Sequence, residues 1–360
     1  MTAADWTTAP CRAPSEPHAE AARARQAVLT KPAGSLGRLE TLAVELAALQ
    51  CTDRPSAARA PILIFAGDHG VTARGVSAYP SEVTVEMLRN FARGGAAIAV
   101  LARELGSSLT VVDAGTLSAE PVEGVITDKP CRGTRDFTSG PAMSAAELGF
   151  ALGCGRRAVG RVRDAGADIL ILGEMGIGNT TTAAAIIAAL VGCAPEAIVG
   201  DGTGVDAAGR ARKANVVREA LALHGFAQST PCADAARVLQ CVGGLEIAAL
   251  AGAMLAAAQA GLPVLVDGFI VGAAALAAVR LDPCVAPWLV YSHTSAERGH
   301  ALVLGALGAR PILDLSLRLG EGSGAALALP IVRLACALHN GMATFAEAAV
   351  SGPASVPAVP

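Results

Sequence analysis

The fold of this chain is decided by residues 169–190, which read ILILGEMGIGNTTTAAAIIAAL. The first four residues form an apolar run of strand length, and the last eight form an Ala-rich segment that favours a helix. A glycine-rich turn lies between the two. Since a strand that passes through a turn into a helix is the building unit of parallel sheets, this stretch predicts an α/β fold.

Similar apolar runs recur from residue 61 onward, and each is followed by a turn signal and a segment of helix length. These runs are residues 62–66, 109–112, 169–172, 264–266, 289–291 and 312–313. Their alternation with helices predicts a Rossmann-like, mostly parallel, doubly wound sheet flanked by helices. Hydrophobic residues make up 52% of the chain and aromatic residues only 3%, which fits Ala-rich helices packed on such a sheet.

Helices are expected at both ends of the chain. Residues 15–30 and 35–49 form two amphipathic segments around the break Lys31-Pro32-Ala33-Gly34. Residues 324–338 and 340–350 also read as helices, and the tail that follows contains several prolines. We therefore expect helical segments on either side of the α/β region.

Net charge and cysteine pattern exclude several classes of function. A formal net charge of −3 and few aromatic side chains argue against nucleic-acid binding, which favours a basic surface and aromatic stacking. The expected partners are therefore small molecules. The nine cysteines show no C-x-x-C motif and no paired spacing with histidine, so the sequence predicts no metal site and no disulfide framework, but free thiols in a reducing cytosol.

The mean hydropathy of +0.48 raises the question of a membrane span, most sharply at residues 245–279. Gln259, Pro263 and Asp267 interrupt this stretch, whereas a span needs about 20 continuous apolar residues. We predict a buried helix, a strand and a second buried helix there, and no membrane span. The first residues lack the apolar segment of a signal peptide, so a cytoplasmic location is expected.

The turn at residues 173–182 is a candidate phosphate site. A glycine turn that leads into a helix presents unpaired backbone N–H groups and the positive end of the helix dipole. Asn179 and Thr180 are expected to add side-chain donors or to cap the helix. The pattern is no dinucleotide fingerprint, because Thr181 stands where Gly or Ala is needed, and no P-loop lysine is present. The alternative is a turn that only packs the helix onto the sheet.

A second glycine loop, residues 200–206 with the sequence GDGTGVD, precedes a helix-length segment that contains Lys213. Two such loops suggest one phosphate held between them, with Lys213 as a point charge. A solvated helix lysine is the alternative for Lys213. Gly202, Gly204 and Ala207 also match G-x-G-x-x-A, a pattern that is weak by itself.

One carboxylate, Glu321, lies between two glycines just before an apolar helix. Glycines let a substrate approach the backbone, and apolar surroundings raise the pKa of a carboxyl toward the range of a general base. Glu321 is therefore the first candidate for catalysis. A solvent-facing turn or a helix cap is the alternative.

Two further polar pairs, Asp68-His69 and Ser292-His293, also follow predicted strands. Each pair is open to an acid–base or a metal-binding role. Because no third ligand stands at a diagnostic spacing, hydrogen-bonded histidines are the simpler interpretation of both.

The sequence resembles the nicotinate-nucleotide:dimethylbenzimidazole phosphoribosyltransferase family of cobalamin nucleotide-loop assembly over nearly its whole length. The resemblance runs through six ordered segments, namely residues 31–40 (KPAGSLGRLE), 67–71 (GDHGV), 173–181, 263–269 (PVLVDGF), 292–297 (SHTSAE) and 318–327. Several long motifs in order are far more specific than one glycine loop.

The resemblance implies a catalytic α/β domain of residues 61–324 and a small helical domain formed by residues 1–60 and 325–360. It further implies a homodimer, with neither a metal nor another cofactor. The implied reaction transfers the phosphoribosyl group of nicotinate mononucleotide to 5,6-dimethylbenzimidazole and gives α-ribazole 5'-phosphate and nicotinate.

This reaction needs one carboxylate, which acts as a general base. The pyridine nitrogen of the donor is already cationic, so nicotinate leaves without a general acid. The incoming base must lose its ring N–H as its other nitrogen attacks the anomeric carbon, and a general base removes that proton. Direct displacement from the opposite face inverts the sugar, in accord with an α product.

Position by position, the resemblance assigns roles to residues of this chain. Glu321 matches the general base, and Glu174 matches the second acidic residue beside the ribosyl donor. Tyr79 and Met87 fall in the segment that lines the benzimidazole pocket. The residues that match the 5'-phosphate site are Gly176, Gly178, Asn179, Thr180, Gly202, Thr203, Gly204 and Lys213.

Two other functions stay open at this point. The match at Gly202 allows a nicotinamide-dependent oxidoreductase, although no acidic residue is convincingly placed to read the ribose. A non-catalytic nucleotide- or benzimidazole-binding protein would bind the same ligands without turnover.

Overall fold

The computed structural model describes residues 5–226 and 229–352 of the chain. The chain divides into two compact units. The first unit comprises Met1–Arg12 and Arg59–Ala328, and the second comprises Ala13–Ala58 and Leu329–Pro360. The assignment of a catalytic domain and a small helical domain to the chain stays a prediction.

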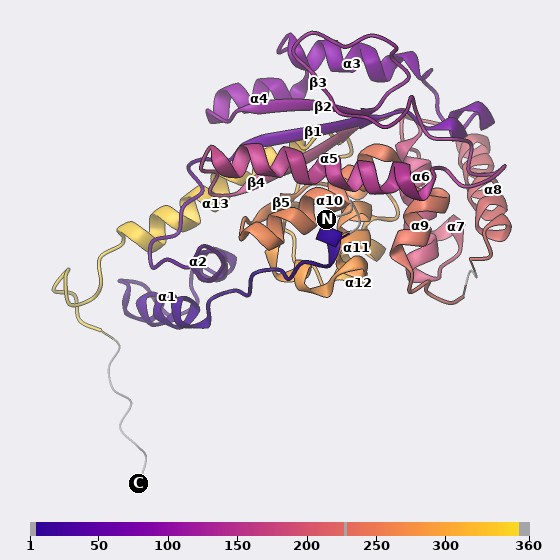
Figure 1. Ribbon diagram of the computed structural model, residues 1–360. Helices are drawn as coiled ribbons and strands as arrows, with labels where there is room; N and C mark the ends of the chain where they lie inside the picture. The colour runs from indigo at the N-terminus through magenta and orange to yellow at the C-terminus, as the bar shows by residue number, and fades with distance from the viewer. Residues whose placement is uncertain (1–4, 227–228, 353–360) are drawn as a thin grey trace. The chain divides into compact units, whose positions relative to one another are not determined.

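The first unit is built on a six-stranded sheet with the strand order β3-β2-β1-β4-β5-β6 (Figure 1). Every neighbouring pair of strands in it is parallel. This confirms the predicted α/β fold with a Rossmann-like sheet. The strands are β1 (Ile62–Gly67), β2 (Leu109–Gly115), β3 (Ile126–Thr127), β4 (Leu170–Met175), β5 (Val264–Val266) and β6 (Leu289–Tyr291).

The order in which strands are added to the sheet reverses between β1 and β4, although all the strands stay parallel. The chain runs from β1 outward to β3, returns to place β4 beside β1, and then extends the other way to β6. In open parallel sheets, ligands bind outside the carboxyl ends of the strands at such a reversal. The loops that follow β1 and β4 are therefore the first place to look for a site.

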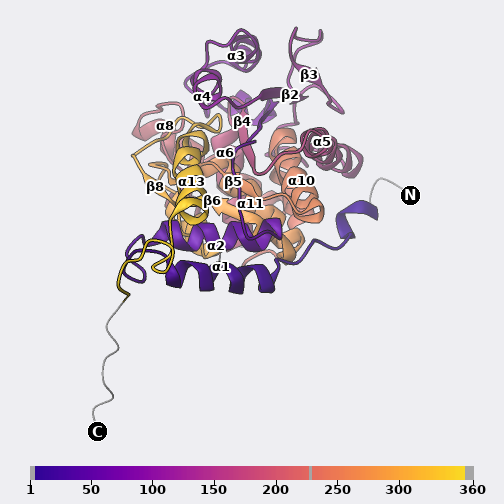
Figure 2. The ribbon, with the colours of Figure 1, turned by 90° about the vertical axis from the view of Figure 1, so that its left-hand side faces the viewer.

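The helices of the first unit follow the predicted alternation with strands. Helix α5 lies beside α10 (Figure 2), and α10 also contacts β1, β2 and β4. This approach needs glycine, because a Cβ at Gly155 would lie 2.0 Å from the carbonyl oxygen of Ala249. The helices are η1 (Asp5–Thr8), η2 (Gly70–Arg74), α3 (Glu82–Ala92), α4 (Ala97–Leu105), α5 (Ala145–Asp164), α6 (Asn179–Val191), α7 (Pro195–Ile198), α8 (Ala207–Leu223), α9 (Ala235–Val242), α10 (Leu245–Ala260), α11 (Phe269–Leu281), η3 (Pro283–Trp288) and α12 (His300–Leu307).

The apolar stretch at residues 245–279 forms α10, β5 and α11, which confirms the predicted helix, strand and helix. Within the described residues, one helix, α13 (Ser323–Gly341), is long and apolar enough to cross a membrane by length and composition alone. The core helices of soluble proteins pass the same test, so α13 gives no firm membrane span.

Two sequence predictions about strands need correction. The run at 312–313 does not join the main sheet but forms β8 (Leu313–Asp314), which pairs with β7 (His293–Thr294) in a separate two-stranded sheet. The short strands β3 and β7 were not predicted. Neither has the apolar run that marks a buried strand, since each contributes only two residues to pairing.

The second unit contains α1 (Glu16–Val28), α2 (Arg38–Gln50) and the end of α13. The first two confirm the predicted helical pair. The predicted helix at 340–350 is wrong beyond Gly341. The backbone N–H of Thr344 donates to Glu347 Oε2 (2.7 Å), the N–H of Glu347 donates back to Thr344 Oγ1 (3.2 Å), and Ala349 takes a left-handed φ of 51°. These contacts close a turn, and Thr344 forms an antiparallel bridge with Leu29 instead of continuing a helix.

Candidate active site

The loops that follow β1 and β4 touch each other where the sheet reverses. A Cβ at Gly176 would lie 2.3 Å from the carbonyl oxygen of Gly67, and one at Gly178 would lie 2.7 Å from Thr72 Cγ2. Gly178 also has a left-handed φ of 95°. Both glycines are therefore required for the close packing of the two loops. A role of the same glycines in holding phosphate stays a prediction.

Asn179 begins α6, but its side chain does not cap that helix. The N-cap is Gly178, and Asn179 Nδ2 donates a hydrogen bond to Oε2 of Glu174. The expectation of a capping side chain is therefore wrong for Asn179, because its amide is used by the neighbouring carboxyl. The bond instead ties the glycine turn to a predicted acidic site residue.

Lys213 on α8 bridges the two glycine loops. Its Nζ donates to Thr180 Oγ1 (2.9 Å) at the first loop and to the carbonyl oxygen of Gly200 (3.4 Å) in the second. The residue is 1% exposed, so Lys213 is not a solvated helix lysine. An ammonium has three N–H donors, so one more is available to an anionic ligand beyond these two contacts.

The second glycine loop packs directly against Lys213. A Cβ at Gly202, whose φ is 52°, would lie 2.7 Å from Thr180 Oγ1 and 2.8 Å from Lys213 Nζ. Gly204 also takes a left-handed φ, of 106°. Thr203 Oγ1 accepts a hydrogen bond from the backbone N–H of Ala78 (3.2 Å). The loop is thus fixed on one side by a buried cation and on the other by the segment before Tyr79.

The two predicted acidic residues lie next to each other at the end of β4. The backbone N–H of Glu321 donates to Oε1 of Glu174 (3.4 Å). Gly173 in β4 supports this contact, because a Cβ there would lie 2.5 Å from the carbonyl carbon of Glu321. Glu174 is 5% and Glu321 7% exposed. The alternative of a solvent-facing turn at Glu321 is therefore wrong.

A continuous chain of contacts joins Glu321 to Lys213. Glu321 contacts Glu174, and Asn179 donates to the other oxygen of Glu174. The next residue along α6 is Thr180, which accepts from Lys213. The predicted general base and the predicted phosphate-binding cation are therefore connected through the first glycine loop.

Glu321 has a strained backbone. Its φ is 64°, between Gly320 at 87° and Gly322 at 82°. Glycine adopts this left-handed region freely, whereas a residue with a side chain is destabilised by about 1–2 kcal/mol. A strained, buried carboxylate between two glycines is the kind of feature that accompanies a functional site.

We expect the substitution Glu321→Gly to raise the free energy of unfolding by roughly 1 kcal/mol, because it removes the left-handed strain and a buried carboxyl. Urea denaturation would measure the change. Ser316→Gly is the matched control, since Ser316 also has a left-handed φ (55°) but is exposed. A Glu321→Gly protein less stable than wild type would contradict the prediction.

The environments of the two carboxyls differ. Burial raises the pKa of Glu174 to about 8, and the nearby charges of Asp267, Glu246 and Glu321 act in the same direction. Glu174 is therefore protonated at neutral pH. Burial also raises the pKa of Glu321, as does Asp267, while the backbone N–H of Ile98 acts against this. Two carboxyls held in different environments are a pattern by which enzymes separate acid and base roles.

Glu174→Gln should make the stability of the protein less sensitive to pH. Between pH 4.5 and about 8 the unfolded chain ionises Glu174 while the folded chain keeps its proton, so wild type loses stability as pH rises. Glutamine cannot ionise. We expect nearly equal stability near pH ~5 and a variant more stable by roughly 3–5 kcal/mol near pH ~9, because each unit of the pKa shift corresponds to about 1.4 kcal/mol. Urea unfolding at both pH values measures this, with the exposed Glu123→Gln as the control.

The two residues predicted to bind the base, Tyr79 and Met87, are more exposed than the two acidic residues of the site. Tyr79 is 56% exposed, and Met87 is half-buried on α3. Their segment contacts both glycine loops: Thr84 Oγ1 accepts from the backbone N–H of Ile177 (3.1 Å), and Ala78 contacts Thr203. The segment thus borders the site, whereas base contact by Tyr79 and Met87 stays a prediction.

Both histidines that follow strands are buried and paired with a carboxylate. His69 Nε2 lies 2.8 Å from Oε1 of Glu246, and its Nδ1 lies 2.9 Å from Thr182 Oγ1. His293 Nε2 lies 3.4 Å from Oδ1 of Asp267. These contacts satisfy both ring nitrogens of His69, as expected, whereas Nδ1 of His293 is buried without a hydrogen-bond partner among the described residues. Among the described residues, no group of three or more His, Cys, Asp and Glu side chains is arranged to hold a metal ion.

The sequence analysis assigned no role to three buried carboxylates around this site. Glu246 lies near the start of the apolar helix α10, Asp267 directly follows β5, and Glu297 lies close to the second glycine loop. The signal for Asp267 was its position at a strand end. A lone charged residue in an otherwise apolar helix was the signal for Glu246, because such a residue is costly to bury without a partner.

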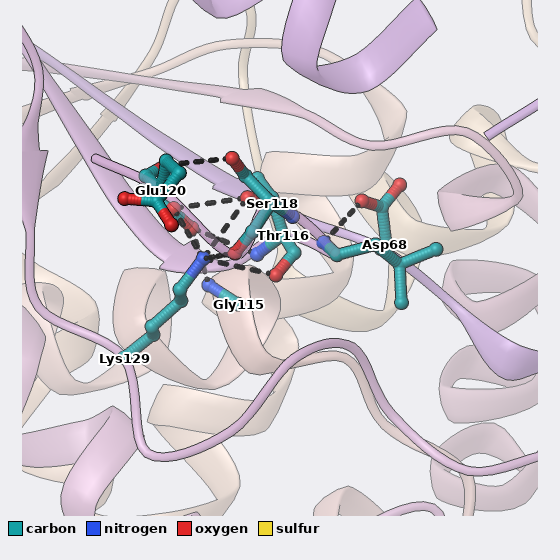
Figure 3. A network of polar contacts seen from close by, with 8 residues as sticks. Asp68, Gly115, Thr116, Ser118, Glu120 and Lys129 are labelled. Atoms are coloured by element: carbon teal, nitrogen blue, oxygen red, sulfur yellow. Dashed lines mark hydrogen bonds and ion pairs between the residues drawn. The ribbon is translucent and has the colours of Figure 1, made fainter. Parts of the chain in front are cut away.

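Lys129 fixes the loop after β2 (Figure 3). Its Nζ donates to Asp113 Oδ2 (2.6 Å) and to the carbonyl oxygens of Thr116 (3.0 Å) and Ser118 (2.9 Å). In the same network, Asp68 Oδ2 accepts from the backbone N–H of the residue after Thr116 (2.8 Å). Since these contacts use the three donors of the ammonium, Lys129 is a structural cation.

The fold and the site together define an α/β enzyme with a Rossmann-like sheet, two glycine loops at its carboxyl edge and a buried pair of carboxyls. Residues 11–350 match the family DBI_PRT, described as phosphoribosyltransferase. The chain belongs to this family of pentosyl-transferring enzymes.

Several relatives agree over nearly their full length. A protein from Bradyrhizobium sp. (strain BTAi1), named nicotinate-nucleotide–dimethylbenzimidazole phosphoribosyltransferase, is 66% identical over 97% of this chain and 98% of its own. A protein of the same name from Pseudomonas aeruginosa (strain PAO1) is 57% identical over 96% and 98%. The crystal structure of the protein with this name from Thermus thermophilus superimposes with a TM-score of 0.88 at 45% identity, covering 94% of this chain and 100% of that one.

Proposed function

We propose that this chain transfers the phosphoribosyl group of nicotinate mononucleotide to 5,6-dimethylbenzimidazole, giving α-ribazole 5'-phosphate and nicotinate in cobalamin nucleotide-loop assembly. The names of the relatives supply the substrates. The single observation on which the site rests is the connection from Glu321 through Glu174 and the first glycine loop to the buried Lys213.

The two glycine loops hold the 5'-phosphate in this proposal. The binding groups are Lys213 Nζ, the Thr180 and Thr203 side chains and the backbone around Gly176, Gly178, Gly202 and Gly204. A buried ammonium supports an anion strongly because little solvent competes with it. The phosphate thereby fixes the ribose, and Glu174 lies beside it as a neutral acid whose pKa is about 8.

Glu321 removes the ring proton of the incoming base. Its carboxyl is buried, its pKa is raised, and Oε2 lacks a hydrogen-bond partner within the described structure. An unpartnered buried acceptor is suited to take a proton from an N–H donor. The other nitrogen of the base then displaces nicotinate directly. Tyr79 and Met87 are proposed to line the base pocket.

The position of the glycine loops argues against the oxidoreductase alternative. A dinucleotide fingerprint needs a strand immediately before the glycines. Here Gly202 follows the short helix α7, and the loop after β4 carries no such fingerprint.

Purified protein mixed with nicotinate mononucleotide and dimethylbenzimidazole should release nicotinate and form a phosphoribosylated base in equal amounts, both followed by chromatography. A reaction without dimethylbenzimidazole controls for simple hydrolysis. Binding of both ligands without product would favour the non-catalytic alternative. Hydride exchange with a nicotinamide cofactor would instead favour the oxidoreductase.

We further propose that the protein is a cytoplasmic homodimer that needs no cofactor. Light scattering would test the dimer, and activity after dialysis against a chelator would test the need for a metal.

A further inference from the structure

Asp267 lies immediately beyond β5 and is 2% exposed. Its Oδ2 accepts a hydrogen bond from the backbone N–H of Gly322 (3.1 Å), and its Oδ1 accepts one from the N–H of Ala325 (2.9 Å). Both donors belong to the segment that follows Glu321. The two oxygens of one buried carboxylate thus hold the start of α13 in place.

This clamp acts on the strained part of the chain. Glu321 keeps its left-handed φ of 64° only if its surroundings prevent the turn from relaxing. On one side, Gly173 packs against the backbone of Glu321, with a built Cβ 2.5 Å from its carbonyl carbon. On the other side, Asp267 fixes the neighbouring Gly322. The direction of the Glu321 side chain therefore depends on Asp267.

Asp267 also contributes charge to the same place. It raises the pKa of Glu321 and, after burial, is the largest cause of the raised pKa of Glu174. Glu246 on α10 and Glu321 itself add to the charge that raises the pKa of Glu174. The backbone N–H of Ile98 in α4 is uncharged and lowers the pKa of Glu321 through a hydrogen bond.

Oδ1 of Asp267 also lies 3.4 Å from Nε2 of His293. Burial lowers the pKa of His293, but the hydrogen bond and charge of Asp267 outweigh this and raise it overall. The neighbouring His300, with ring centroids 6.2 Å away, has a pKa lowered to about 4 by burial and stays neutral. Of these two histidines, His293 is therefore the one that can carry a positive charge beside Asp267.

We propose that Asp267 is a positioning residue for the transfer reaction: it holds the 320–322 turn in the conformation that presents Glu321, and its charge, balanced by His293, sets how readily Glu321 takes a proton. This inference rests on the proposed function, in which Glu321 is the base. It assigns a role to Asp267 and His293 in addition to those of Glu321 and Glu174.

Two variants with opposite expected effects test this proposal. Asp267→Asn keeps the size of the side chain and removes its charge, so the acid limb of the kcat/KM profile should move to lower pH by roughly one unit, with a lower plateau. His293→Gln removes the positive partner and keeps a hydrogen-bond donor for Asp267, so the acid limb should move to higher pH. Ser295→Ala, a change beside His293 that removes no charge, is the control.

A merely structural role would lower the rate at every pH and leave the acid limb in place. An unmoved limb in Asp267→Asn therefore overturns the proposal. If Asp267→Asn does not fold, His293→Gln decides alone, and a limb that stays or moves to lower pH overturns the proposal. Wild-type protein without any transfer would remove the proposed function and this inference together, whereas active wild type with unmoved limbs would remove this inference only.

Discussion

Glu321→Gln should lower kcat for phosphoribosyl transfer by roughly two to four orders of magnitude, the range expected for loss of a general base. The reason is specific to the site. Glutamine keeps the shape of the side chain in the left-handed turn, but it cannot accept the ring proton of the incoming base. Steady-state release of nicotinate at saturating concentrations of both substrates measures the change.

Two controls separate this effect from a change in folding. The exposed Glu123→Gln should keep wild-type activity. Thermal unfolding of Glu321→Gln should match wild type within about 1 kcal/mol, because the strained backbone is unchanged. A near wild-type kcat would remove Glu321 as the base and make Glu174 the next candidate.

The acceptor itself offers a sharper test. In 1-methylbenzimidazole the ring N–H is replaced by a methyl group, so attack by the other nitrogen requires no base. With this acceptor, the ratio of wild-type to Glu321→Gln rates should fall toward one. A ratio that stays in the hundreds would mean that Glu321 acts through binding or orientation and not by removing a proton.

The sheet was predictable because its strands are short and each contains a run of mostly apolar residues. Each of the runs that became β1, β2, β4, β5 and β6 is buried over most of its length, and each ends in a turn signal. Strand order was less accessible, because periodicity says nothing about which strands pair. The two-residue strands β3 and β7 were missed since their pairing depends on neighbouring strands and not on local sequence.

The site was partly predictable for a similar reason. The resemblance to the family pointed to Glu174, and glycines on both sides pointed to Glu321. Nothing local indicated that Lys213 is buried, because α8 as a whole is polar and its lysine looks like any surface lysine. The pairing of His69 with Glu246 spans 177 positions and appears only when α10 packs on β1. The sequence pattern does not reveal long-range contacts of this kind.

Lys213→Met should lower kcat/KM for nicotinate mononucleotide by roughly tenfold to a few hundredfold, with kcat changed much less. The phosphate is bound equally in the ground state and the transition state, since it takes no part in the bond exchange. Loss of its cation therefore appears mainly in KM. Methionine fills the buried space left by the lysine stem, so the fold should persist.

The same residue predicts the alkaline limb of the wild-type profile. Burial lowers the pKa of Lys213 to about 8, so its charge is present below that pH and lost above it. The profile of kcat/KM, which reports the free enzyme, should therefore fall as pH rises through about 8. This fall should weaken or vanish in Lys213→Met, whose affinity is already reduced at every pH.

The neighbouring Arg212→Met is the matched control, because it removes a cation from the same helix that is exposed and donates to the carbonyl oxygen of Gly75 (3.0 Å). It should leave KM within about threefold of wild type, as expected for an exposed charge. If Arg212→Met and Lys213→Met raised KM equally, the phosphate would be drawn by the general field of α8. A large effect of Lys213 alone would localise the anion to the point where both glycine loops meet, since only there does a buried ammonium contact Thr180 and Gly200 together.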